Sequence, residues 1–152
     1  MREGKLYGSD DFNPIYILTQ IAALVALWYS AQSILLVLFN NLFGLPTHLA
    51  QLFSTSALDL QDSYSLVAVL TTVLGAVVLT VALVVVVERA NKCLDFASTV
   101  YCLHVVGVWM YEGFPVLVTW WGVQFASMIT VILVSEFLCM KIEQQQISLA
   151  VK

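Results

Sequence analysis

The sequence predicts an all-α membrane protein with four transmembrane helices and both termini cytosolic. Of its 152 residues, 61% are hydrophobic and 11% are charged, against roughly 25% charged in a soluble domain. Four long runs contain no Asp, Glu, Lys or Arg: Phe12–Leu58, Ser63–Val87, Phe96–Tyr111 and Gly113–Ser135. All basic residues lie in alternate gaps between these runs: Arg2, Lys5, Arg89, Lys92, Lys141 and Lys152. The positive-inside rule assigns those gaps to the cytosol.

The first predicted transmembrane helix spans 15–39 and follows a cytosolic tail at 1–14. Asn13 offers a capping side chain, and Pro14 stands where a helix does not need its N–H. Gln20, near the cytosolic end, is expected to hydrogen-bond a neighbouring helix. The apolar run is too long for the core of a cleaved signal peptide, so we expect a retained anchor.

A lumenal loop is predicted at 40–63, before a second transmembrane helix at 64–87. Apolar residues at helical spacing in the loop indicate a helix lying in the membrane interface. An apolar, partly ordered loop explains the composition of this segment equally well. The second helix contains 15 Val and Leu residues among 24, and a run of this length is a span rather than a strand.

The second half of the chain is predicted to contain two further transmembrane helices. The segments are a cytosolic loop at 88–95, a transmembrane helix at 96–111, a lumenal turn at 112–113, a transmembrane helix at 114–135 and a cytosolic tail at 136–152. The third uncharged run is about 24 Å long as a helix, short of a hydrocarbon core of roughly 30 Å. That helix must therefore extend into its flanks, or place Asp95 and Glu112 at the two interfaces.

Composition excludes several classes of protein. The chain has no room for a soluble catalytic domain and lacks a combination of nucleophile, base and oxyanion donors, so we expect neither an enzyme nor a cofactor. It has no basic stripe for nucleic acid and no closely spaced metal ligands. Its three cysteines are interpreted as unlinked thiols, with S-palmitoylation of Cys93 or Cys139 as the alternative.

The candidate functional residues are the few polar side chains within or beside the predicted spans. His104 is the one ionisable residue inside a predicted core, where either core hydrogen bonding or partner recognition would explain it. Lys92 and Asp95 are three positions apart and can pair on one helix face. Alternatively, they form a polar pocket with Glu136 that opens to the cytosol.

Together these residues resemble the SYS family of small integral Golgi membrane proteins. The similarity covers nearly the whole chain. It is carried by the run Lys92-Cys93-Leu94-Asp95-Phe96, by Thr99 and His104, by Phe114-Pro115, Thr119-Trp120-Trp121 and Gln124, and by Glu136, Leu138, Cys139 and Glu143. Pro14 and Gln20 also fit, whereas Asn13 stands where Asp is expected in the family.

The resemblance implies a multi-pass protein of the trans-Golgi membrane. Such proteins act as receptors for an Arf-like small GTPase with an acetylated N-terminus, supporting golgin recruitment and endosome-to-Golgi vesicle traffic. An acetylated amphipathic helix alone binds membranes weakly, so a protein receptor supplies a second signal. We expect Asp95, Lys92 and Glu136, with His104 and Gln20 deeper, to form the docking pocket. A small four-helix transporter or channel and a structural membrane scaffold are the alternatives.

Overall fold

The computed structural model describes residues 13–58, 63–87 and 89–150, and no strand occurs among them. The elements are α1 (Pro14–Phe43), α2 (Ala50–Phe53), the 3-10 turn η1 (Ser56–Leu58), α3 (Ser63–Val87), α4 (Ala90–Glu112) and α5 (Val118–Ala150). Helices α1, α3, α4 and α5 are each long and apolar enough to cross a membrane, which confirms the predicted all-α class and its four spans. The cytosolic placement of the termini stays a prediction, and Arg2, Lys5, Glu88 and Lys152 lie outside the described residues.

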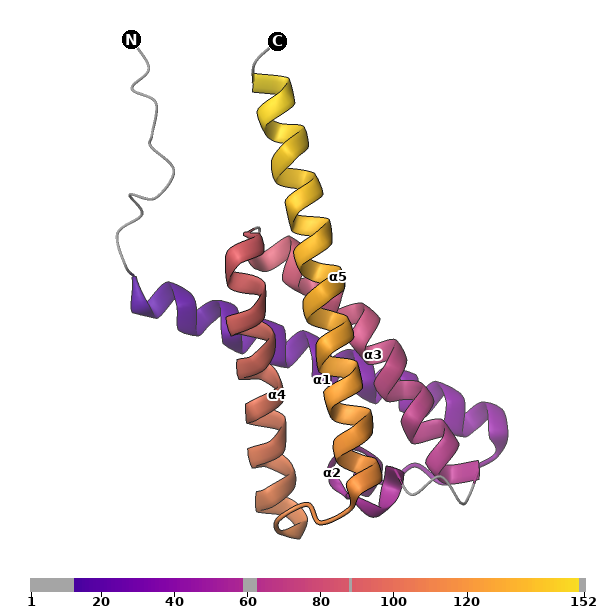
Figure 1. Ribbon diagram of the computed structural model, residues 1–152. Coiled ribbons are helices and arrows are strands. Elements are labelled where there is room, and N and C mark those ends of the chain that lie inside the picture. Colours follow the sequence, from indigo (N-terminus) through magenta and orange to yellow (C-terminus); the bar gives the residue numbers. More distant parts are fainter. Residues whose placement is uncertain (1–12, 59–62, 88, 151–152) are drawn as a thin grey trace.

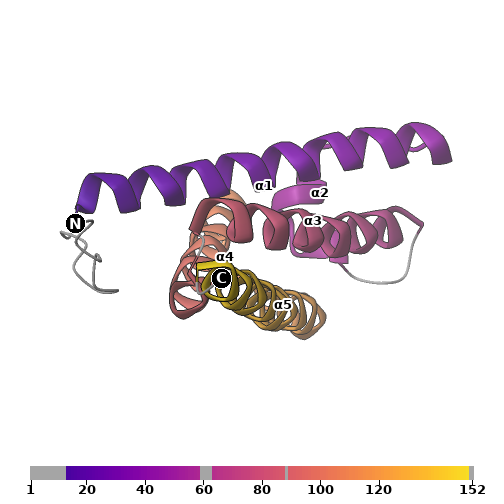
Figure 2. The same cartoon turned by 90° about the horizontal axis from the view of Figure 1, so that it is seen from above.

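The four long helices form one bundle in which α4 and α5 make an antiparallel hairpin (Figure 1). Helix α5 packs on both α3 and α4, while α1 packs mainly on α3 and runs along one flank of the bundle (Figure 2). The shared core contains Leu24 and Trp28 of α1, Leu79 and Leu83 of α3, and Val131 of α5, each at most 1% exposed. The start of α4 and the last third of α5 lie at one end of the bundle, and the α4–α5 turn lies at the other (Figure 1).

Helix α1 is capped by Asn13 at its start and by Gly44 at its end. The Asn13 side chain accepts hydrogen bonds from the backbone N–H groups of Ile15 and Tyr16, at 3.2 and 3.3 Å. Pro14 is the first helical residue, and Gly44 ends the helix in the left-handed conformation with φ of 65°. The helix therefore continues past the span predicted at 15–39, because no residue before Gly44 breaks it.

Two predicted connections and the predicted C-terminal tail differ in helical extent from the observed segments. The cytosolic loop predicted at 88–95 is helical from Ala90, and the tail predicted at 136–152 is helical to Ala150. A charged residue ends a membrane span but does not end a helix. The turn predicted at 112–113 instead continues to Leu117, because the residue before Pro115 is disfavoured in helical conformation. Helix α5 thus begins at Val118 rather than at 114.

The segment predicted as a lumenal loop at 40–63 contains the short helix α2 and the turn η1 in its described part. Its position is set by two hydrogen bonds between the Asn40 and Gln51 amides, at 2.6 and 3.2 Å. Thr55 donates its backbone N–H to the Glu112 carboxylate at 2.6 Å, which ties the segment to the end of α4. The segment therefore lies against the bundle and contains a four-residue helix, while its place in the membrane interface stays a prediction.

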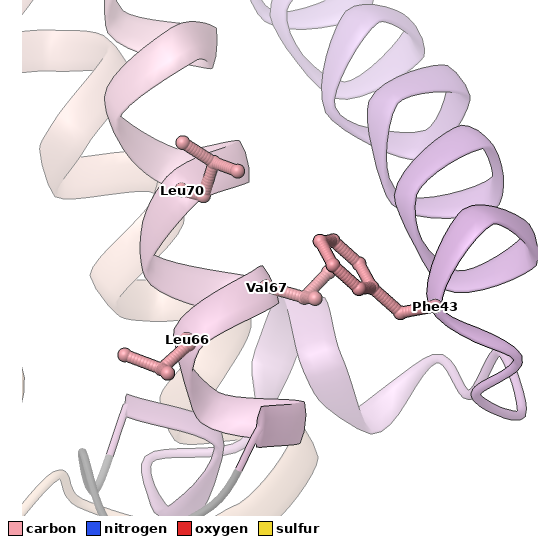
Figure 3. Close-up of a pocket in the computed structure, with 4 residues that line it drawn as sticks. All are labelled: Phe43, Leu66, Val67 and Leu70. Atoms are coloured by element: carbon pink, nitrogen blue, oxygen red, sulfur yellow. The ribbon is translucent and has the colours of Figure 1, made fainter.

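A small apolar cavity of about 180 Å³ separates the last turn of α1 from the first turns of α3. Phe43 reaches from α1 toward Val67 of α3, and Leu66 and Leu70 complete the lining (Figure 3). Since all four side chains are hydrocarbon, this cavity offers no group for polar recognition.

Candidate functional site

The polar centre of the bundle is built around His104, which is 3% exposed on the inner face of α4. Its Nδ1 lies 3.0 Å from the Tyr29 hydroxyl of α1, and its Nε2 lies 3.3 Å from the amide nitrogen of Gln124 on α5. The two ring nitrogens therefore contact one hydroxyl and one amide, and the tautomer of the imidazole sets which partner donates in each bond. One imidazole thereby joins three transmembrane helices.

Aromatic rings enclose this imidazole. Trp28 meets it edge-on with ring centroids 5.1 Å apart, and Trp120 stacks on it at 6.1 Å. Phe53 of α2 approaches to 6.2 Å and Tyr29 to 5.9 Å. Trp28 and Trp120 are each only 1% exposed, so the centre is filled by side chains. The arrangement gives His104 the core hydrogen-bonding role that was one of its two interpretations.

Three polar atoms close to this centre have no hydrogen-bond partner within the described chain: Trp28 Nε1, Gln32 Nε2 and Gln124 Oε1. An unsatisfied buried polar group costs about 1–3 kcal/mol. The Gln32 side chain lies against α3 at Gly75, where an added Cβ would be 2.8 Å from Gln32 Cγ. Gly75 is therefore the residue that lets the two helices accommodate a buried glutamine.

A second group of contacts lies near the end of the bundle predicted to be cytosolic. Gln20 of α1 donates its amide N–H to the Val86 carbonyl of α3 at 2.7 Å, which is the expected bond to a neighbouring helix. At the junction of α4 and α5, the Cys93 and Cys139 sulfurs are 3.6 Å apart. The Glu143 carboxylate accepts from the Ala90 backbone N–H at 3.2 Å. This last bond caps α4, whose own N-cap residue Arg89 makes no side-chain capping bond.

The charged residues predicted to share a docking pocket are not all brought together. Asp95 and His104 are nine positions apart on α4, about 180° around the helix and about 13 Å along it. Consistent with that, Asp95 is exposed while His104 is buried. Lys92 is also exposed, and no ion pair joins it to Asp95 in the part of the chain that the structure describes. Solvation of both charges offsets what their attraction would gain.

Glu136 lies one turn before Cys139 on α5 and is half-buried. Asp95 is about 200° around α4 from Cys93, the residue that faces α5, so the two carboxylates flank different sides of the hairpin. The structure therefore separates two groups among the predicted site residues. Lys92 and Asp95 form an exposed face of α4, whereas His104 and Gln20 make internal bonds.

A groove of about 440 Å³ runs between α3 and α5. Its hydroxyl groups are used within the protein: Thr80 donates to the Ala76 carbonyl, Thr130 donates to the Ala126 carbonyl, and Ser127 bonds Tyr101. The groove consequently presents a hydrocarbon surface. No group of three or more His, Cys, Asp or Glu that could hold a metal ion forms within residues 13–58, 63–87 and 89–150.

Fold and site define a polytopic helical membrane protein with a closed, aromatic-packed centre and a charged face at one end. The chain belongs to the SYS1 family, described as "Integral membrane protein S linking to the trans Golgi network", which matches residues 7–149. The family is one of membrane trafficking proteins. No solved structure matches the chain.

Three relatives share this similarity. The chain is 29% identical over 143 residues to "Protein SYS1 homolog" of Dictyostelium discoideum, covering 94% of this chain and 62% of that protein. It is 28% identical over 139 residues to "Protein SYS1 homolog" of Nematostella vectensis, covering 91% and 88%. It is 25% identical over 134 residues to "Protein SYS1" of Saccharomyces cerevisiae, covering 87% and 66%. The chain thus spans slightly less than two thirds of the length of the first and third relatives.

Proposed function

We propose that the protein is a receptor of the trans-Golgi membrane that recruits an N-terminally acetylated Arf-like small GTPase, thereby supporting golgin recruitment and endosome-to-Golgi traffic. The observation that carries the proposal is the SYS1 family match over residues 7–149, whose description links the family to the trans-Golgi network. The four apolar helices leave little chain outside a membrane, which suits a protein that positions a partner at a bilayer.

The face of α4 that carries Lys92 and Asp95 is the proposed docking surface, and Glu136, on another side of the α4–α5 hairpin, is a separate candidate contact. Both α4 side chains are exposed, and neither is committed to an ion pair within the described residues. Charged groups on such a surface steer and orient a partner more than they add affinity. His104 and Gln20 support docking indirectly, because their internal bonds hold α1, α3, α4 and α5 in place.

Co-precipitation with Arf-like GTPases locked in the GTP or GDP state tests the proposal. Asp95→Ala and Lys92→Ala chains that still reach the Golgi should each recover at least fivefold less GTP-bound partner. Leu94→Ala is a matched control, since Leu94 is exposed on the same turn but uncharged. Undiminished recovery with Asp95→Ala, Lys92→Ala and Glu136→Ala would exclude this surface.

The same purification discriminates the alternatives. A scaffold would recover a stable membrane-protein partner that ignores the bound nucleotide. A transporter or channel requires a polar path through the bundle centre, where Trp28 and Trp120 are almost fully buried against His104. That packing favours the receptor over the transporter.

A further inference from the structure

The α4–α5 junction holds two thiols in direct contact. The Cys93 and Cys139 sulfurs lie 3.6 Å apart, and the two side chains are 0% and 1% exposed. Ala90 is buried with them, and Val84 of α3 packs against the group. Two sulfurs at this separation need to approach by about 1.5 Å to reach the length of a disulfide bond.

The two thiols lie on different helices of the hairpin, so a disulfide between them would join α4 to α5. Cys93 lies in the first turn of α4, and Cys139 lies 46 positions later, about two thirds of the way along α5. Beyond Cys139, the hydrogen bond from Ala90 N–H to the Glu143 carboxylate is a polar contact between α5 and the start of α4. The part of α5 after this contact extends past the N-terminal end of α4 (Figure 1). A bond between the sulfurs would therefore fix the two helices at the base of that extension.

We propose that Cys93 and Cys139 form a reversible dithiol–disulfide couple that locks the C-terminal part of α5 onto the first turn of α4. A hydroperoxide is the oxidant. Its O–O bond breaks, one S–S bond forms, and both thiol protons leave in water, so that two thiols and hydrogen peroxide give one disulfide and two water molecules. A small-molecule thiol reverses the step by exchange through a mixed disulfide.

The predicted cytosolic position makes the dithiol the resting state, because disulfides in that compartment are transient and serve redox sensing. Complete burial makes both sulfurs slow to react while the junction is closed. Oxidation therefore begins when the end of α5 opens locally, and the disulfide then captures the closed arrangement. The same burial withholds Cys93 and Cys139 from an acyltransferase, which opposes the palmitoylation alternative.

Peptide mapping of the full-length chain in membranes tests the pairing. After treatment with hydrogen peroxide and blocking of remaining thiols with N-ethylmaleimide, the 93–139 disulfide should exceed any link to Cys102 at least tenfold. Cys102 is the internal control, since it is exposed on the same helix. Disulfides between separate chains, acylation of Cys93 or Cys139, or oxidation confined to Cys102 would each overturn the proposal. The wild-type chain suffices, so no variant has to fold.

Hydrogen exchange tests the lock itself. Once the disulfide forms, the backbone amides from Asn91 to Asp95 should exchange at least fivefold more slowly, and dithiothreitol should restore the original rate. In a Cys139→Ser chain, peroxide should leave these rates unchanged, while Cys102→Ser should behave like the wild type. Unchanged exchange in a fully cross-linked wild-type chain would show that the bond does not lock the junction.

Discussion

The bundle centre and the α4–α5 junction both contain buried polar or polarisable groups, yet they hold the helices together in different ways. At the centre, His104 bonds side chains from α1 and α5 and is packed between Trp28 and Trp120. At the junction, one carboxylate reaches one backbone N–H, and two thiols touch. The polar contacts of the centre thus involve three long helices, whereas those of the junction join the start of α4 to α5.

This difference predicts different consequences of opening each region. Loss of packing at the centre removes contacts from α1, α4 and α5 together, so it should lower the stability of the whole bundle. Loss of the junction removes contacts only between the start of α4 and the facing part of α5. These two segments should therefore open locally while the rest of the bundle stays folded. Regions that bind partners or switch state are drawn from the less stable parts of a protein, which is consistent with function at the junction end.

Trp28→Ala should show the largest effect, because it removes a ring that contacts Tyr29, Tyr101 and His104. Truncation of a buried aromatic side chain costs about 3–5 kcal/mol. Unfolding of the purified protein in mixed micelles, titrated with SDS, would measure the change. Trp109→Ala is the matched control, since Trp109 is 59% exposed and should cost less than about 1 kcal/mol. Equal losses in the two variants would contradict the central role of Trp28.

Gly75→Ala should be the next most damaging change. The new Cβ would lie 2.8 Å from Gln32 Cγ and 3.1 Å from its amide nitrogen, so the buried glutamine must move or α1 and α3 must separate. Overpacking of this kind costs about 1–3 kcal/mol. The same SDS titration would detect it.

Gly122→Ala provides the control for Gly75, because an added Cβ at Gly122 meets nothing within 4 Å. It should leave stability unchanged or raise it slightly, given the helix propensity of alanine. A Gly75→Ala and Gln32→Ala double variant should recover part of the loss, since the clashing side chain is shortened. Additive losses would mean that Gly75 matters for a reason other than Gln32.

Sequence patterns predicted the four long helices, but they did not predict which side chains make contact between the helices. Uncharged runs and the Asn13-Pro14 start predicted four spans and the observed cap of α1. The same charge criterion misplaced the loop at 88–95, because Asn91 to Asp95 contains neither Gly nor Pro to stop a helix. A charge marks where the membrane ends, and helix termination depends on different residues.

The candidate site illustrates the same limit. His104 was identifiable as a lone ionisable residue in an apolar run, but its partner Tyr29 was not, because one tyrosine in a long apolar helix carries no pairing signal. The prediction of a single pocket left out the helical periodicity of α4. Each residue turns the helix by about 100°, so Asp95 and His104, nine positions apart, lie on opposite sides. The Cys93–Cys139 contact needs the register of α4 against α5, and that register arises only from tertiary packing.

Glu143→Ala should have the smallest effect on overall stability and the clearest local one. It removes the carboxylate that accepts from Ala90 N–H, and loss of a helix cap costs about 0.5–2 kcal/mol. Because only the junction depends on this bond, hydrogen exchange should accelerate in the first turn of α4 and remain unchanged around Val108, which is fully buried. Gln144→Ala, at the exposed neighbouring position, should alter neither region. If Glu143→Ala instead accelerated exchange at Val108 as much as in the first turn, the junction would be part of the global core, and the contrast between the two regions would not hold.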